Sequence, residues 1–201
     1  MTLTIIKYNA GNIQSVLYAL ERIGMSATVT DDHDKIMNSD KVIFPGVGEA
    51  SSAMKYLKDR GLDTIIKNLQ QPVLGICLGM QLMCMHSEEN NTDCLGIFDE
   101  KVKSFKSPPF EEDAEVFKIP LIGWNNIYNM RSPLFSSIEE KSYCYFVHGY
   151  FASLGAHTIA TTNYILPYSA ALQKDNFFGV QFHPEKSANV GERIIRNFIE
   201  M

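Results

Sequence analysis

A cysteine between two glycines is the residue of this 201-residue chain that is best placed for covalent chemistry. Cys77 follows the apolar residues 73–76, precedes a segment with helical spacing, and has Gly75 and Gly79 on either side. A strand-to-helix turn of this kind strains the backbone at its apex and crowds the flanking residues, which favours glycine there. The dipole of the following helix favours negative charge on the sulfur. The pattern therefore predicts a nucleophile, although a free cysteine taken alone is typically a small buried hydrophobe.

A histidine and an acid much later in the chain could serve this nucleophile. Residues 177–182 are expected to form a buried strand that leads directly into His183, Pro184 and Glu185. In an extended chain, residues two apart point to the same face, so His183 and Glu185 can lie side by side. The histidine could take the thiol proton and return it to a leaving amine while the carboxylate orients the ring. Together with Cys77 the pair has the composition of a catalytic triad, whereas alone it would indicate a strand end and a surface acid.

A glycine-rich turn could supply hydrogen-bond donors to the same site. Residues 42–44 read as a short apolar strand, and Pro45, Gly46, Val47 and Gly48 follow it. Glycines let backbone N–H groups approach a ligand, and a donor aimed at a developing oxyanion is worth about 3 kcal/mol. The alternative is an ordinary strand-turn-helix connection. The turn is not a phosphate-binding loop, because no lysine follows at the required place.

The elements that must position these residues alternate between strands and helices. Strands are expected over residues 3–6, 27–30, 41–44 and 73–76, and helices over 13–23, 50–60, 62–69 and 190–199. This alternation implies a parallel sheet covered on both faces, with chemistry at the carboxyl ends of the strands. All three candidate site elements directly follow a predicted strand.

The pattern changes after residue 95. Short strands are expected over residues 98–102, 122–127, 143–147, 158–162 and 169–172, and they suit an added antiparallel layer. Residues 107–113 are polar and contain two prolines, which predicts an exposed loop. The predicted fold class is α/β, with a central, mostly parallel sheet flanked by helices and an added antiparallel layer. At this length, residues 1–201 are expected to form a single domain.

Composition narrows the function classes. A formal net charge of −5 argues against nucleic acid as a partner. The four cysteines form no C-x-x-C pair, which argues against a zinc site and fits a reducing, cytoplasmic location. No metal or other cofactor is expected. No apolar stretch approaches the ~20 residues of a membrane span, and the N-terminal residues 1–7 are too short an apolar run for a signal peptide.

Six motifs spread over nearly the whole chain give it a family resemblance. They are Y-N-A-G-N-I-Q-S-V at residues 8–16, P-G-V-G at 45–48, G-I-C-L-G-M-Q at 75–81, G-W-N at 123–125, Y-F-V-H-G-Y at 145–150 and Q-F-H-P-E-K at 181–186. The chain resembles the class I, triad-type glutamine amidotransferases, and within them the glutaminase subunits of imidazole glycerol phosphate synthase. The resemblance implies a flavodoxin-like three-layer sandwich.

The resemblance also implies roles for individual residues. It implies Cys77 as nucleophile, His183 as base and Glu185 as orienting acid. The implied oxyanion hole consists of Gly46, Val47 and Leu78, and the Gly46–Val47 peptide is expected to flip before its N–H faces the substrate. Gly48 and Gln81 are implied to hold the substrate glutamine. For Gln81, helix geometry agrees, because a residue four positions after Cys77 lies one turn along the same face.

The implied reaction is hydrolysis of glutamine to glutamate and ammonia through a cysteine thioester. The ammonia would pass to a cyclase subunit with a (β/α)8-barrel fold, which makes imidazole glycerol phosphate and aminoimidazole carboxamide ribotide in histidine biosynthesis. The two subunits would form a heterodimer. The residues implied to face the cyclase are Asn12, Trp124, Tyr145 and Lys186.

Three positions depart from the family pattern, and two other functions remain open. Asn9 and Leu121 put details of partner contact in doubt, and Gly149 replaces a residue that usually carries a hydroxyl group. The chain could instead be a glutaminase of a pyridoxal phosphate or anthranilate pathway, which P-G-V-G and G-W-N argue against. It could also be a catalytically silent scaffold subunit, which the intact triad argues against.

The other histidines carry less information. His148 is compatible either with a structural hydrogen bond or with a role near the site. His33, His86 and His157 are expected to be ordinary surface or loop residues.

Overall fold

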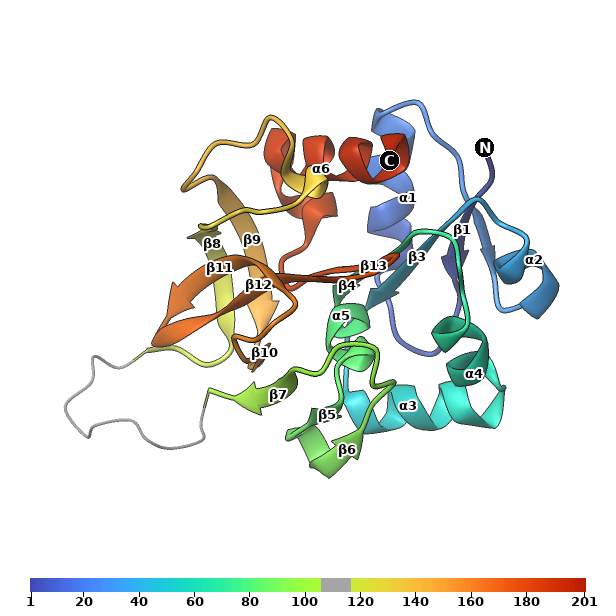
Figure 1. Ribbon diagram of the computed structural model, residues 1–201, viewed down its shortest axis with the longest axis horizontal. Coiled ribbons are helices and arrows are strands. Elements are labelled where there is room, and N and C mark those ends of the chain that lie inside the picture. The colour runs from blue at the N-terminus through green and yellow to red at the C-terminus, as the bar shows by residue number, and fades with distance from the viewer. Residues whose placement is uncertain (106–116) are drawn as a thin grey trace.

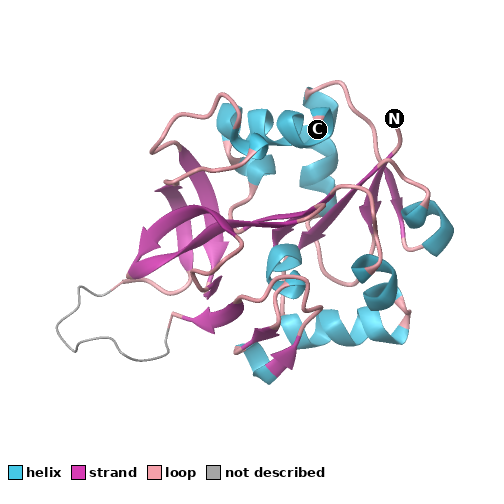
Figure 2. Cartoon of the chain, in the orientation of Figure 1, coloured by secondary structure: helices cyan, strands magenta, loops and turns pink. Residues whose placement is uncertain are grey.

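The computed structural model describes residues 1–105 and 117–201. A central sheet runs through the middle of the molecule, with helices on both of its faces (Figures 1 and 2). On one face lie α1 (Ile13–Arg22) and α6 (Ala188–Glu200), and on the other lie α3 (Ala50–Asp59), α4 (Leu62–Lys67) and α5 (Leu78–Met83). The short helix α2 (His33–Met37) lies beside one edge of the sheet. The three-layer α/β architecture predicted from the sequence is therefore confirmed.

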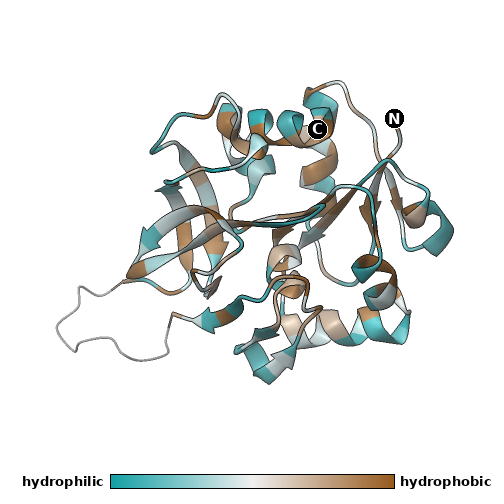
Figure 3. Cartoon of the chain, viewed as in Figure 1, coloured by the Kyte–Doolittle hydropathy of each residue, from teal (hydrophilic) through white to brown (hydrophobic). Residues whose placement is uncertain are grey.

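In the described part of the chain, the central sheet has seven strands in the order β11-β12-β13-β4-β3-β1-β2. Five of them are parallel, namely β1 (Leu3–Ile6), β2 (Thr28–Thr30), β3 (Lys41–Gly46), β4 (Val73–Cys77) and β13 (Phe177–Val180). Every residue of β1, β3, β4 and β13 is buried, as expected for strands covered on both faces, and these strands are largely apolar (Figure 3). The strand order places the carboxyl ends of β3, β4 and β13 next to one another.

The later strands differ from the sequence prediction in their placement. The strands predicted over residues 158–162 and 169–172 are β11 (Thr158–Tyr164) and β12 (Leu166–Lys174), and both extend the central sheet. Strand β12 pairs antiparallel with β13, and Ala170 and Ala171 are fully buried there. Period-two patterning reports which face of a strand is buried but not which sheet the strand joins, which is why the prediction put these strands in the added layer.

The remaining strands form two smaller sheets. One is the antiparallel pair β8 (Leu121–Asn126) and β9 (Tyr143–His148), and the other contains β10 (Tyr150–Ala152), β7 (Lys101–Ser104), β5 (His86–Ser87) and β6 (Thr92–Asp93). The strand predicted over residues 98–102 begins only at Lys101. Residues Ile97 and Phe98 turn instead, because both of their N–H groups donate to the Met83 carbonyl at 2.9 Å, which buries Phe98 beneath α5.

Two short segments differ in how they relate to the sequence: helix α2 was not predicted, and a loop was predicted over residues 107–113. Helix α2 is not predicted by hydrophobic spacing, since Ile36 is its single buried residue; it begins where the Asp32 carboxylate accepts the Lys35 N–H at 3.0 Å. The exposed loop predicted over residues 107–113 lies outside the described residues. Among the described residues, no helix is long and apolar enough to cross a membrane.

Candidate active site

Cys77 lies at the turn between β4 and α5 in a conformation that L-residues rarely adopt. Its backbone angles are φ 53° and ψ −110°, a strain of about 1 to 3 kcal/mol for such outliers. The flanking glycines permit the turn, since a Cβ on Gly79 would lie 1.9 Å from the Phe44 carbonyl oxygen and one on Gly75 would lie 2.9 Å from Met80 N. Any larger residue at position 79 would therefore separate α5 from β3 and displace the cysteine.

His183 and Glu185 meet, but not in the extended chain that the sequence analysis assumed. Strand β13 ends at Val180, and Pro184–Lys186 form a 3-10 turn whose first hydrogen bond runs from Lys186 N to His183 O at 3.0 Å. The turn brings Glu185 Oε1 within 2.8 Å of His183 Nδ1. Both side chains are almost fully buried. Proline at the first turn position favours this conformation because it lacks an N–H group and has a fixed φ.

The electrostatics of His183 depend on its two neighbours. Burial by itself would lower the pKa of His183, but hydrogen bonds and attraction from Cys77 and Glu185 outweigh it and raise the pKa to about 10. Because the neighbouring charges favour the protonated ring, the arrangement suits a thiolate beside an imidazolium. Since Nδ1 faces Glu185, the other ring nitrogen is the one left to serve Cys77.

The sulfur of Cys77 has two further polar neighbours. Gln181 Nε2 lies 3.7 Å from Sγ, and the Val147 carbonyl oxygen lies 3.7 Å from it on strand β9. Gln181 belongs to the Q-F-H-P-E-K motif but no role is predicted for it, because an interior glutamine next to a strand carries no chemical signal of its own. Position 181 does lie two residues before His183, the spacing that places side chains on one face of an extended chain.

Cys77 and His183 open into a cavity of about 260 Å³. Pockets for drug-sized ligands measure about 300 to 1,000 Å³, so this one suits a molecule the size of an amino acid. The residues that line it are Val47, Gly48, Cys77, Leu78, Gln81, Glu89, Val147, His148, Gly149, Tyr150, His183 and Lys186. Of the residues predicted for catalysis and substrate binding, the lining omits Glu185, which lies behind His183, and Gly46.

Gly46 is the last residue of β3 and pairs in register with Cys77. A Cβ there would lie 2.5 Å from the Tyr8 hydroxyl and 2.7 Å from Gly79 N, so only glycine fits. Val47 and Gly48 continue from it into the cavity wall, and Leu78 lies in the same wall. Gly48 has φ +114°, a region that favours glycine. Three of the predicted oxyanion and substrate residues therefore line the same cavity as Cys77.

Gln81 extends from α5 into the cavity and is held by two acceptors. Its Nε2 lies 2.9 Å from the Tyr150 carbonyl oxygen and 2.9 Å from Gln181 Oε1. Both N–H groups of the Gln81 amide are thus used, which leaves its oxygen to accept a hydrogen bond from a ligand.

Glu89 also lines the cavity, and the sequence analysis missed it. Its Oε2 accepts the Ala50 N–H at 2.8 Å. Burial raises the pKa of Glu89, the Ala50 N–H opposes that effect, and the nearby Glu49 charge adds to it. A positively charged ligand group would offset the cost of burying this carboxylate. An acid among the polar residues 87–93 is expected from the sequence to lie on the surface. In the structure this loop folds back over the start of α3, which places Glu89 in the cavity wall.

His148 makes structural hydrogen bonds and also lies in the cavity wall. Its Nδ1 lies 2.8 Å from the Tyr150 carbonyl oxygen and its Nε2 lies 3.0 Å from the Tyr168 hydroxyl, while the ring also lines the cavity. Burial lowers the pKa of His148 to about 4, against the effect of the Tyr150 hydrogen bond and with a contribution from His183. His148 is therefore a neutral ring at neutral pH, and it helps to hold the Tyr150 peptide in the cavity wall.

The predicted partner-facing residues are all at least partly exposed. Trp124 on β8 and Tyr145 on β9 are cross-strand partners with ring centroids 5.7 Å apart, and Trp124 is 51% exposed. Lys186 is exposed and lines the cavity. Asn12 is half-buried just before α1. With Ile122 and Tyr143, which are also exposed, Trp124 and Tyr145 form an apolar surface that we call the β8–β9 face.

The three departures from the family pattern have different settings. Leu121 is 7% exposed and packs in the hydrophobic core, so its side chain is largely removed from the surface where a partner would bind. Gly149 lines the cavity directly. Asn9 donates a hydrogen bond to the Ser52 carbonyl at 3.3 Å.

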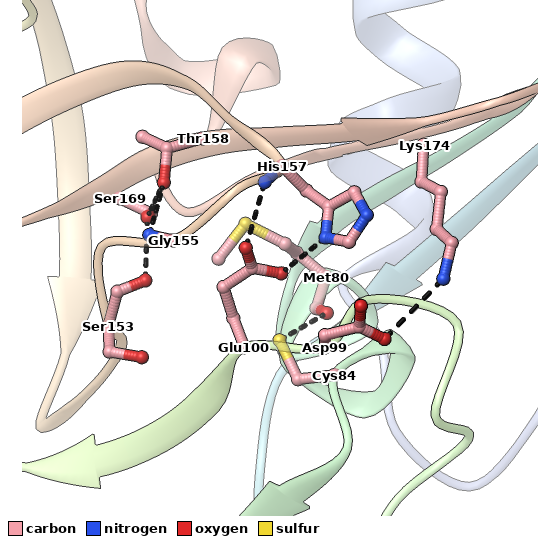
Figure 4. A network of polar contacts seen from close by, with 10 residues as sticks. All are labelled: Met80, Cys84, Asp99, Glu100, Ser153, Gly155, His157, Thr158, Ser169 and Lys174. Carbon is pink, nitrogen blue, oxygen red and sulfur yellow. Dashed lines mark hydrogen bonds and ion pairs between the residues drawn. The ribbon is translucent and has the colours of Figure 1, made fainter.

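A second polar cluster, which contains the buried Glu100, includes none of the residues that line the cavity (Figure 4). Glu100 is buried and accepts the His157 backbone N–H at 2.9 Å, and its other oxygen lies 3.0 Å from His157 Nδ1. His157 is therefore more than the ordinary loop histidine expected from the sequence. The pair joins the loop after β10 to the start of β7, and the cluster drawn in Figure 4 includes none of the predicted catalytic residues.

Comparison with known proteins agrees with this geometry. A family model described as glutamine amidotransferase class-I matches residues 4–201. The imidazole glycerol phosphate synthase subunit HisH of Bacteroides fragilis is 56% identical over 201 residues, covering 100% of both chains. The subunit of the same name from Shewanella loihica is 47% identical over 98% of this chain and 89% of its own.

Solved structures share the fold at much lower identity. The structure of PurLQS from Thermotoga maritima has a TM-score of 0.71 at 16% identity, covering 99% of this chain and 97% of that one. A glutamine amidotransferase from the same organism has a TM-score of 0.61 at 18% identity, covering 100% of this chain and 83% of that one.

Proposed function

Because the chain belongs to the class I glutamine amidotransferase family, we propose that it hydrolyses glutamine to glutamate and ammonia as a subunit of imidazole glycerol phosphate synthase. The ammonia is delivered to a cyclase subunit that makes imidazole glycerol phosphate and aminoimidazole carboxamide ribotide. The observation that carries the proposal is that Cys77 lines an amino-acid-sized cavity together with His183, whose ring pairs with Glu185. The proposal requires no metal or cofactor.

Each chemical step is assigned to a residue of the cavity or to a residue next to it. The Cys77 thiolate attacks the side-chain amide carbon of glutamine, and the resulting oxyanion is held by backbone N–H groups of Val47 and Leu78. Protonated His183 gives its proton to the leaving nitrogen, so ammonia departs and a thioester remains. Water then attacks the thioester, His183 takes a proton from that water, and glutamate leaves as the thiolate is restored. Glu185 keeps the ring oriented in both halves of the reaction.

Substrate recognition follows from the charges of the cavity. The α-ammonium group of glutamine is a cation, and the Glu89 carboxylate is the acid in the cavity lining. Lys186 in the same lining suits the α-carboxylate. The free oxygen of the Gln81 amide accepts a hydrogen bond from an N–H group of the substrate.

We expect Glu89→Gln to raise KM for glutamine about tenfold and to leave kcat within a small factor, because the ion pair is made equally in ground and transition states. For a glutamine analogue that lacks the α-amino group, the same substitution should leave KM unchanged. Steady-state kinetics with both substrates makes the test. Glu192→Gln on the outer face of α6 is the matched control. A fall in kcat with unchanged KM would contradict this role for Glu89.

The partner is proposed to bind the β8–β9 face. Large aromatic and aliphatic side chains are exposed there, and strand β9 continues from this face directly into the cavity wall at Val147 and His148. Ammonia is small and neutral and escapes readily into water, so a partner that receives it must cover the route out of the cavity. The proposed site of action is the cytoplasm, where the four free cysteines stay reduced.

Glutamine hydrolysis should depend on this partner. We expect the isolated chain to produce glutamate slowly, the complex with the cyclase at least about tenfold faster, and the complex with bound acceptor substrate faster still. The physical reason is that the Gly46–Val47 peptide must turn its N–H toward the substrate, and partner binding shifts the population toward that conformation. Measured glutamate formation in the three mixtures decides the matter.

Three results would contradict the proposal. Near-equal rates in all three mixtures would remove partner control. No glutamate in any mixture would favour the silent scaffold subunit. Stimulation by an anthranilate or pyridoxal phosphate pathway subunit, but not by the cyclase, would assign the chain to one of those pathways.

A further inference from the structure

The side chain of Gln181 connects the nucleophile to the substrate-binding glutamine. Gln181 follows β13, has no exposed surface, and donates its backbone N–H to Ala170 O on β12 at 2.8 Å. Its Nε2 lies 3.7 Å from Cys77 Sγ, and its Oε1 lies 2.9 Å from Gln81 Nε2. A single buried amide therefore contacts both side chains.

The direction of each amide follows from a backbone carbonyl. The Tyr150 oxygen can only accept hydrogen bonds, so the Gln81 atom beside it is the nitrogen. The Gln181 atom that meets this nitrogen must then be an acceptor, which makes it the oxygen. The NH2 group of Gln181 consequently faces Cys77, and the oxygen of Gln81 faces the cavity.

The two neighbours of the sulfur favour different protonation states. The Val147 carbonyl accepts a hydrogen bond from the thiol and repels the thiolate, whereas the Gln181 NH2 group donates to the thiolate. A donor to a charged sulfur forms a stronger hydrogen bond than a donor to a neutral one. The amide therefore favours the charged nucleophile and holds its sulfur in place for His183.

Resting on the proposed glutaminase function, we propose that Gln181 is a positioning residue with two roles. Its NH2 group holds the Cys77 thiolate in position for attack, and its carbonyl oxygen fixes Gln81 with the Gln81 oxygen turned toward the substrate. Neither role transfers a proton or forms a bond to the substrate.

The test compares Gln181→Met with the wild type in complex with the cyclase. We expect kcat for glutamine hydrolysis to fall about tenfold and KM to rise about tenfold, because both contacts of the amide are lost. Alkylation of Cys77 by iodoacetamide should reach half its maximal rate at a higher pH than in the wild type. Gln181→Glu should lower kcat further, since an acid would then face the thiolate. Synthesis from added ammonium should stay at the wild-type rate in both variants.

Gln173→Met is the matched control, because this glutamine in β12 contacts Ser132 and does not line the cavity. Wild-type kcat and an unshifted alkylation profile in Gln181→Met would overturn the proposal. So would a loss of kcat with an unshifted profile and a fall in melting temperature equal to that of Gln173→Met, which indicates packing alone. A wild-type complex that forms no glutamate would overturn the proposed function, and this inference with it.

Discussion

Cys77→Ala should lower glutamine-dependent turnover by at least about ten-thousandfold while leaving synthesis from added ammonium salt intact. Without the sulfur no thioester can form, and removing a nucleophile from a triad costs about as much as removing the whole triad. The cyclase receives ammonia from solution in the second assay, so its rate reports only whether the complex is assembled. Both rates are measured on the same preparation, from glutamate and from imidazole glycerol phosphate.

The other cysteines provide the control. Burial raises the pKa of Cys94 and of Cys144 to about 12, so neither is a competent nucleophile at neutral pH. Cys94→Ala should therefore retain full glutaminase activity, and a glutamine-like electrophile should label Cys77 alone. Retained glutamine turnover in Cys77→Ala would disprove the assignment. Loss of ammonium-dependent synthesis as well would indicate a disrupted complex.

The second large effect is expected at His183. His183→Ala should lower kcat/KM by about ten-thousandfold, because the proposed mechanism uses His183 to move the proton between Cys77 and the leaving nitrogen. Glu185→Ala should lower kcat/KM by a factor about tenfold to a hundredfold smaller than His183→Ala does. The base remains in this variant, and only its orientation and charge stabilisation are lost. Both variants need a melting temperature near that of the wild type for the comparison to hold. The reverse ranking in folded variants would mean that the two roles are misassigned.

The same pair makes a prediction about pH. The pKa of His183 is raised to about 10, so the ring stays charged at neutral pH and loses its proton as the pH rises through about 10. Glu185→Gln removes one of the effects that raise this pKa. The alkaline limb of kcat/KM should therefore move to lower pH in this variant, measured from about pH 6 to about pH 11. An unmoved limb would show that Glu185 does not stabilise the charged ring.

Features that depend on neighbours in the chain were accessible from the sequence. The elbow at Cys77 depends on glycines two positions away, and their steric demand is the same in any fold that contains the turn. Strand-helix alternation is equally local, and it predicts a parallel sheet with the chemistry at the carboxyl ends of its strands. Motif resemblance added the residue roles and the proposed reaction.

The sequence does not determine the backbone conformation of a short segment when two conformations compete. The sequence analysis expected His183 and Glu185 on one face of an extended chain, but Pro184 begins a 3-10 turn and brings them together in a different way. The same two residues meet in either case, so the expected contact did not depend on the conformation assumed. The placement of β11 and β12 could not be predicted in this way. Which strands pair depends on contacts between distant segments, and not on the residue pattern within one segment.

The sequence by itself therefore determined the fold class, the elbow and the residue types of a triad, because each is encoded over a few neighbouring positions. Only the tertiary structure decided that Glu89 lines the cavity, that Gln181 contacts both Cys77 and Gln81, and that Glu100 pairs with His157. These residues lie far apart in the chain and have no characteristic spacing. Their roles arise because folding removes polar groups from water, and each buried polar group must then find a partner in space.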